Sequence, residues 1–243
     1  MLILFPLSVS AQRNLKDSSI TTIIFSPHYK FNLTGEDMAD RWGFNHLVGL
    51  NFGVKLKNNI TIDADGGLIF GNKLRDTALY DFLNNSYGNI TTLGGTPAQV
   101  LYFMRGASAH VNFGYVFSKI GGVNPNSGLW VNVGAGYLMH KIHIESTYDQ
   151  VPQTEGQYKK GFDKLTMGFS TKQFVGYLYQ SNKMFLNFYA GVEFTEGFTK
   201  NIRTYNFASG GTEYESRLDM MYSFKAGWLI PMYKRAPKKY YYD

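Results

Sequence analysis

The side chains of a hydrolase site occur close together in this sequence. Ser108 and His110 are two residues apart, and Asp63 or Asp65 could supply the acid. A Ser-His-Asp triad requires mutual hydrogen bonds and a cleft that admits the substrate. The chain has no Gly-x-Ser-x-Gly segment, in which a sharp turn exposes the serine. We therefore expect no catalytic site and no enzymatic activity.

The sequence also gives no indication of a metal or a cofactor. His140 and His143 are three residues apart, which places them on opposite faces of a strand, so they cannot share a metal. Cysteine is absent, which excludes disulfides and thiolate ligands. The glycine pairs at 94–95 and 121–122 match no phosphate-binding motif. Much of the formal net charge of +6 lies in loops and in the last ten residues, so we expect no nucleic-acid partner.

The stretch from Met184 to Phe194 alternates with a period of two, which indicates a strand. One face is apolar: Met184, Leu186, Phe188, Ala190, Val192 and Phe194. The other is polar or small: Asn187, Tyr189, Gly191, Glu193 and Thr195. Small residues and a lone carboxylate suit a narrow polar interior, with the apolar face toward lipid. This inversion is typical of a transmembrane β-barrel.

Seven further segments have similar alternation. The eight predicted strands are 21–33, 45–56, 60–70, 100–117, 129–144, 164–180, 184–194 and 218–232. The connections after strands one, three, five and seven are long, and the others are shorter, as in outer-membrane barrels. We predict a loop at 34–41, a short helix within 77–83, a two-residue turn at 181–182 and disturbed pairing at Pro27.

The amino-acid composition also agrees with a transmembrane β-barrel. The 243 residues suffice for one barrel domain with sizeable loops, and no apolar run is long enough for a membrane-spanning helix. Glycine (26 residues) and aromatics (16%) are frequent, whereas charged residues are only 17%. The predicted fold is all-β, an eight-stranded antiparallel up-and-down transmembrane β-barrel located in the outer membrane.

Strand parity directs many charged side chains into the barrel. The predicted lumen charge network comprises Lys30, Lys55, Asp63, Asp65, His110, Lys172, Glu193 and Lys225, with His28 and His140 on the same side of the wall. An eight-stranded lumen is just wide enough for side chains to fill, and buried charges must be paired. We expect a satisfied polar plug, with a proton path or a small-ion site as the alternative.

The two-residue turn at 181–182 predicts how the sixth and seventh strands pair. It places Lys172 opposite Gly191 and Ser170 opposite Glu193. Lys172 and Glu193 are then diagonal neighbours on one face, within reach of each other.

The two ends of the chain have their own composition. Residues 1–11, MLILFPLSVSA, are similar to a secretory signal peptide cleaved before Gln12, without the usual basic start, as in a truncated signal. An ordinary apolar first strand is the alternative. The barrel occupies 12–233, and a basic, aromatic tail occupies 234–243. The tail contains Lys234, Arg235, Lys238, Lys239, Tyr240, Tyr241 and Tyr242. It is interpreted as a docking peptide for a periplasmic partner or as a mobile end that touches lipid phosphates.

From residue 21 to 233 the chain resembles the small outer-membrane β-barrels of Gram-negative bacteria. The segment 225–232, KAGWLIPM, resembles their terminal assembly signal. The segments 124–128, 158–161 and 233–240 resemble small barrels of the Bacteroidota. This narrower resemblance implies an accessory subunit of an outer-membrane machine, such as a barrel-assembly or type IX secretion complex.

We therefore predict a non-enzymatic structural or accessory subunit, in contact with outer-membrane lipid and with other outer-membrane or periplasmic proteins. A free-standing barrel that binds or passes a small solute is the main alternative. A lipid-modifying hydrolase is the less favoured one.

Overall fold

The computed structural model describes residues 18–76, 84, 87, 89–146, 151–156, 158–181, 186–207, 210–212 and 215–232. The predicted signal peptide at 1–11, the helix predicted within 77–83 and the tail at 234–243 all lie outside these residues.

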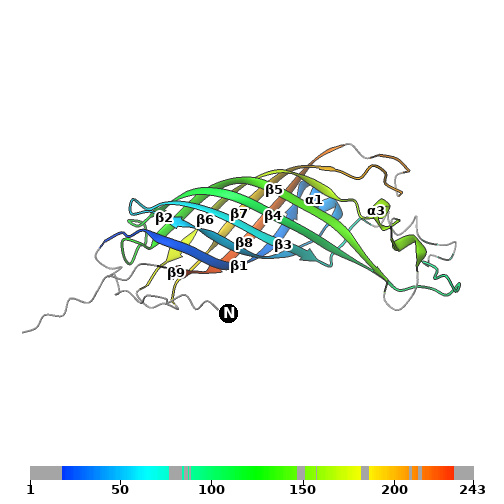
Figure 1. Cartoon of the computed structure of the whole chain (residues 1–243), viewed down its shortest axis with the longest axis horizontal. Coiled ribbons are helices and arrows are strands. Elements are labelled where there is room, and N and C mark those ends of the chain that lie inside the picture. The colour runs from blue at the N-terminus through cyan, green and yellow to red at the C-terminus, as the bar shows by residue number, and fades with distance from the viewer. Residues whose placement is uncertain are drawn as a thin grey trace, which may run out of the picture.

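Eight strands form a closed antiparallel ring (Figure 1). They are β1 (Thr22–Gly35), β2 (Asn45–Lys55), β3 (Ile60–Gly71), β4 (Val100–Phe117), β5 (Gly128–Ser146), β6 (Thr166–Tyr179), β7 (Phe188–Asn201) and β8 (Ser216–Trp228), and a short β9 (Ile230–Met232) continues β8. Each strand pairs with the next along the chain, and β8 and β9 pair with β1, which closes the ring. Closure leaves no exposed edge of backbone donors and acceptors. The predicted eight-stranded up-and-down barrel is confirmed.

The faces of the strands are those predicted from the period-two pattern. On β4, the inward His110 is 3% exposed, whereas its outward neighbour Val111 is 66% exposed. On β7, Glu193 is buried, and Val192 on the other face is 53% exposed. Polar side chains are therefore inside and apolar side chains outside, the reverse of a water-soluble domain.

The pairing of β1 with the last strand is interrupted beside Pro27. His28 pairs with Gly227 and Phe25 pairs with Ile230, so the register is the same before and after the gap that contains Leu229. Proline lacks the N–H that a ladder bond requires. The predicted disturbance is thus an interruption between β8 and β9, without an inserted residue.

The predicted loop at 34–41 is wrong. β1 continues to Gly35, and Glu36–Arg41 form the helix α1. Acidic Glu36 and Asp37 in its first turn suit the positive end of the helix dipole, and Met38 is fully buried. Two further short elements, a 3₁₀ turn at Pro152–Thr154 and the helix α3 (Lys159–Phe162), lie in the connection from β5 to β6. Among the described residues, no helix is both long enough and apolar enough to cross a membrane.

The predicted register of β6 against β7 is also wrong. Lys172 pairs with Thr195 rather than Gly191, and Glu193 pairs with Phe174 rather than Ser170, a shift of four residues. The cause is a connection longer than two residues, because β6 ends at Tyr179 and β7 begins only at Phe188. An even shift keeps every side chain on its predicted face.

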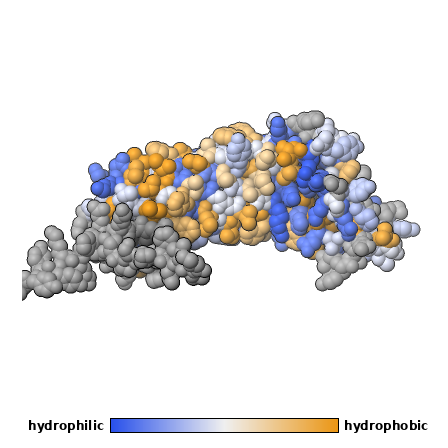
Figure 2. Space-filling model, viewed as in Figure 1, coloured by the Kyte–Doolittle hydropathy of each residue, from blue (hydrophilic) through white to orange (hydrophobic). Residues whose placement is uncertain are grey.

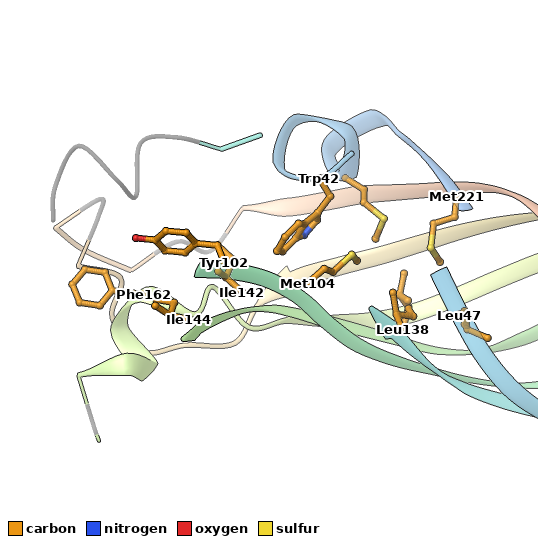
Figure 3. Packing of buried hydrophobic residues seen from close by; sticks show 11 residues of the cluster. Trp42, Leu47, Tyr102, Met104, Leu138, Ile142, Ile144, Phe162 and Met221 are labelled. Carbon is orange, nitrogen blue, oxygen red and sulfur yellow. The ribbon is translucent and has the colours of Figure 1, made fainter. Parts of the chain in front are cut away.

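Two apolar clusters occupy the two ends of the lumen. The loop-end cluster, beside α1, contains Met38, Trp42, Leu47, Ile69, Tyr102, Met104, Leu138, Ile142, Ile144, Phe162 and Met221. Figure 3 shows Trp42 reaching down from the end of α1 toward Met104 on β4. The turn-end cluster contains Ile24, Val116, Trp130, Phe174, Leu178, Tyr189 and Leu229. Except for Lys55, which lies at the turn end, the predicted lumen charges lie on the strand segments between the two.

Candidate functional site

Five charged side chains from five strands meet in the middle of the lumen. This charged layer consists of Lys30 on β1, Asp65 on β3, Lys172 on β6, Glu193 on β7 and Lys225 on β8. All five side chains are at most 5% exposed. The closed ring brings them together, because alternate residues of every strand face the same narrow interior.

Glu193 and Asp65 each bridge lysines from different strands. The Glu193 oxygens accept from Lys30 Nζ at 2.5 Å and from Lys225 Nζ at 2.9 Å. Asp65 Oδ2 accepts from Lys225 Nζ at 2.9 Å and also from Lys172 Nζ. Lys172 Nζ lies 3.7 Å from Glu193 Oε2, so the predicted meeting of these two residues occurs, although in a different register. Each carboxylate therefore ties three lysines into one connected layer.

Asp63 is the inward-facing residue of β3 that precedes Asp65, and its hydrogen-bond donors are amide groups. Its Oδ1 accepts from the amide groups of Asn51 at 2.8 Å and Asn112 at 2.5 Å. Counted formally, Asp63 brings the carboxylates in this region to three, equal to the lysines of the charged layer. Such a balance reduces the cost of burying charge, because these six side chains together carry no formal net charge.

His110 takes part in a Ser-His-Asp arrangement, but with a serine that the sequence did not indicate. Its Nε2 lies 2.8 Å from Ser170 Oγ, and its Nδ1 lies 3.7 Å from Asp65 Oδ1. Ser170 is fully buried within the barrel. A nucleophile needs an approach for its substrate, and Ser170 has none. The arrangement is interpreted as part of the polar packing of the lumen.

Lys55 is the one predicted member of the network that lies apart from it. It ends β2 at the turn end of the barrel, where its Nζ donates to Ser19 Oγ at 3.1 Å and to Asn126 Oδ1 at 3.0 Å. Asn126 Oδ1 also accepts from the backbone N–H of Ile20 at 2.9 Å. Lys55 therefore helps to fix the segment before β1 against the β4–β5 turn.

A second polar group lies near the loop-end cluster. His140 Nε2 lies 2.8 Å from Asp219 Oδ2, and Thr199 Oγ1 donates to the same oxygen at 2.5 Å. Asp219 on β8 is fully buried. It was not among the predicted lumen charges, although it lies within the predicted strand 218–232 and strand parity places it on the same face as Lys225. His143 lies on the opposite face of β5, as predicted. The described residues contain no group of three metal-binding side chains.

The outer wall carries an apolar belt bounded by aromatic side chains. Near the long loops, Phe31, Phe44 and Phe70 surround His46 with ring centroids 5.6–5.7 Å from it. Near the short turns lie Tyr115, Phe117, Tyr179, Phe188 and Trp228. Figure 2 shows hydrophobic residues over the middle of the barrel and a hydrophilic band on the side of α1 and α3.

This exterior is the one that a spanning β-barrel presents to lipid. The chain is a transmembrane β-barrel. Its long connections and α1 are at one end, and its short turns are at the other. In outer-membrane barrels the long loops are extracellular and the short turns are periplasmic.

No protein-family model and no curated protein matches the chain. Among solved structures, similar chains include Ail, the attachment invasion locus protein of Yersinia pestis, at 9% identity and a TM-score of 0.42, and Ail in complex with the heparin analogue sucrose octasulfate, at 10% and 0.40. Both comparisons cover 86% of this chain and 99% of Ail. The backbone structure of Ail in a phospholipid bilayer nanodisc has 8% identity and a TM-score of 0.29, covering 85% and 99%.

Proposed function

We propose that this barrel is closed to solutes, carries no catalytic site and acts as a structural or accessory subunit of a larger outer-membrane complex. The observation that supports this most directly is the layering of the lumen. The charged layer lies between the loop-end and turn-end clusters, and all three consist of buried side chains. A protein of this shape interacts with other molecules through its loops, its wall and its ends.

The long loops support this proposal because they are packed against one another. The Phe207 ring lies 5.1 Å from that of Phe162, and a Cβ on Gly161 would lie 2.0 Å from Phe207, so only glycine fits there. Arg203 Nε donates to Asp163 Oδ1 at 2.7 Å, and this bond raises the pKa of Arg203. Loops fixed in this way form a defined outer surface, which suits a permanently bound partner protein.

The tail at 234–243 is the proposed docking segment on the periplasmic side. Lysine, arginine and three consecutive tyrosines are recognition chemistry beyond what strand pairing needs. The resemblance of the tail and of two turn segments to small barrels of the Bacteroidota favours a barrel-assembly or type IX secretion complex as the larger assembly. The main alternative, a barrel that binds or passes a small solute, has less support from the buried layers.

Deleting residues 237–243 is expected to weaken co-purification of larger outer-membrane proteins with a tagged barrel. The described strands end at Met232, so the barrel should still form and still migrate faster before heating than after it. The measurement is quantitative mass spectrometry of the eluate from native membranes. The double substitution Lys57→Gln and Lys119→Gln at the exposed turns is a charge control and should change little. Unchanged co-purification after the deletion would exclude the tail as the docking segment.

A further inference from the structure

Two basic side chains interrupt the outer wall at its loop end. Arg105 on β4 and Lys141 on β5 are direct cross-strand partners, and both point away from the lumen. The next partner of Arg105, on β3, is Phe70, which belongs to the aromatic group around His46. Aromatic girdles mark the boundary between hydrocarbon and headgroups. The two cations therefore lie at the level of the lipid headgroups.

In the part of the chain that the structure describes, no carboxylate forms an ion pair with Arg105 or Lys141. Like charges directly opposite each other on a sheet destabilise the pairing. The Arg105 guanidinium lies 5.2 Å from the centre of the Phe103 ring, and its Nη1 donates to the Met104 carbonyl at 3.1 Å. These contacts hold the arginine in place but leave its charge and that of Lys141 available to an anion.

An apolar groove of about 350 Å³ opens on the wall beside the pair. The residues that line it include both cations: Leu68, Ile69, Phe70, Arg105, Gly106, Ala107, Met139 and Lys141. The groove exists because Ala107, which follows Arg105 on the outer face of β4, is small, whereas its direct cross-strand partners Leu68 on β3 and Met139 on β5 are larger.

Other hollows of the wall lack this combination. One of about 490 Å³ is lined by Tyr29, Ala190, Ala226 and Trp228 among others, and one of about 350 Å³ by Leu33, Phe194 and Tyr222 among others. Neither lining includes a lysine or an arginine. They offer acyl chains an apolar surface without a site for a headgroup.

We propose that Arg105, Lys141 and the groove form a binding site for a membrane lipid with a phosphate headgroup. The phosphate lies between the guanidinium and the ammonium, and an acyl chain lies along Leu68, Ala107 and Met139. Arginine and lysine both bind phosphate strongly, and each basic residue near a membrane surface contributes about 1 kcal/mol to attraction of anionic lipid. A lipid is favoured over a soluble anion because the groove opens toward hydrocarbon. The inference requires only the lipid-facing wall and is independent of the proposed accessory role.

The test is native mass spectrometry of the purified full-length barrel titrated with phosphatidic acid, and with diacylglycerol carrying the same chains. We expect selective binding of phosphatidic acid. The double variant Arg105→Gln/Lys141→Gln should weaken it roughly tenfold or more. Ala107→Phe, which fills the groove and keeps both charges, should also weaken it. The matched double variant Lys57→Gln/Lys119→Gln should bind as the native chain does, and all variants must retain heat-modifiable migration.

Three results would overturn the proposal. Equal binding of diacylglycerol would remove the role of the phosphate. Unchanged binding by the Arg105→Gln/Lys141→Gln variant would place the lipid elsewhere. Full competition by inorganic phosphate or sucrose octasulfate, together with unchanged binding by Ala107→Phe, would identify a site for soluble anions.

Discussion

Replacing Glu193 with glutamine is expected to lower the free energy of unfolding of the barrel by about 3–5 kcal/mol. Glu193 accepts from Lys30 at 2.5 Å and Lys225 at 2.9 Å, and all three side chains are buried. Glutamine keeps the shape but removes the charge that compensates two ammonium groups. The measurement is reversible urea unfolding in lipid vesicles.

A matched control is Glu145→Gln, on the exposed part of β5 near the loops. It should change the free energy of unfolding by about 0.5 kcal/mol or less. A double-mutant cycle between Glu193→Gln and Lys30→Met should give a coupling energy within about 0.5–3 kcal/mol, and the cycle with the more distant Lys172 a smaller one. Strict additivity in both cycles would show that the charged layer does not exist as described.

The substitution Val111→Arg is expected to have the second large effect on the free energy of unfolding. Val111 is 66% exposed on the outer face of β4, between Ala109 and Phe113 in the belt. An arginine near the bilayer midplane of a barrel costs about 2–4 kcal/mol, because hydrocarbon cannot solvate it. The measurement is again unfolding in vesicles.

Val123 provides a closely matched comparison, because it is 67% exposed but lies in the β4–β5 turn, outside the strands. Val123→Arg should cost about 0.5 kcal/mol or less. Phe188→Arg should cost about 1 kcal/mol or less for the charge itself, because Phe188 begins β7 beside Tyr179 and so lies near the interface. Equal costs at Val111 and Val123 would contradict the assignment of the outer face to lipid.

Most of the barrel could be predicted because its pattern is local. Each strand repeats every two residues, so the inward set at Ser108, His110 and Asn112 follows from the sequence alone. The predicted bounds of β4 match the structure, and those of β2 differ by one residue. Strand parity predicted in the same way that Lys30, Lys172 and Lys225, among others, face the lumen.

The features that were missed depend on contacts between distant segments. The β6–β7 register follows from the length of one connection, which the Ser181-Asn182 pair does not reveal. α1 has six residues, which are too few to show helical periodicity in the sequence. Met38 and Trp42 belong to the loop-end cluster, and this packing depends on contacts with distant strands. Ser170 meets His110 across the lumen, sixty residues away in the sequence, so no spacing indicates that contact.

Closure of the lumen is tested most directly by single-channel recording. Purified full-length barrel is inserted into a planar bilayer, and insertion is verified by heat-modifiable migration of the same sample in vesicles. The charged layer and the two apolar clusters consist of buried side chains inside the lumen, so we expect no steady conductance steps. Steady, voltage-stable conductance from the folded barrel would contradict the closed lumen and would favour the solute-passing alternative.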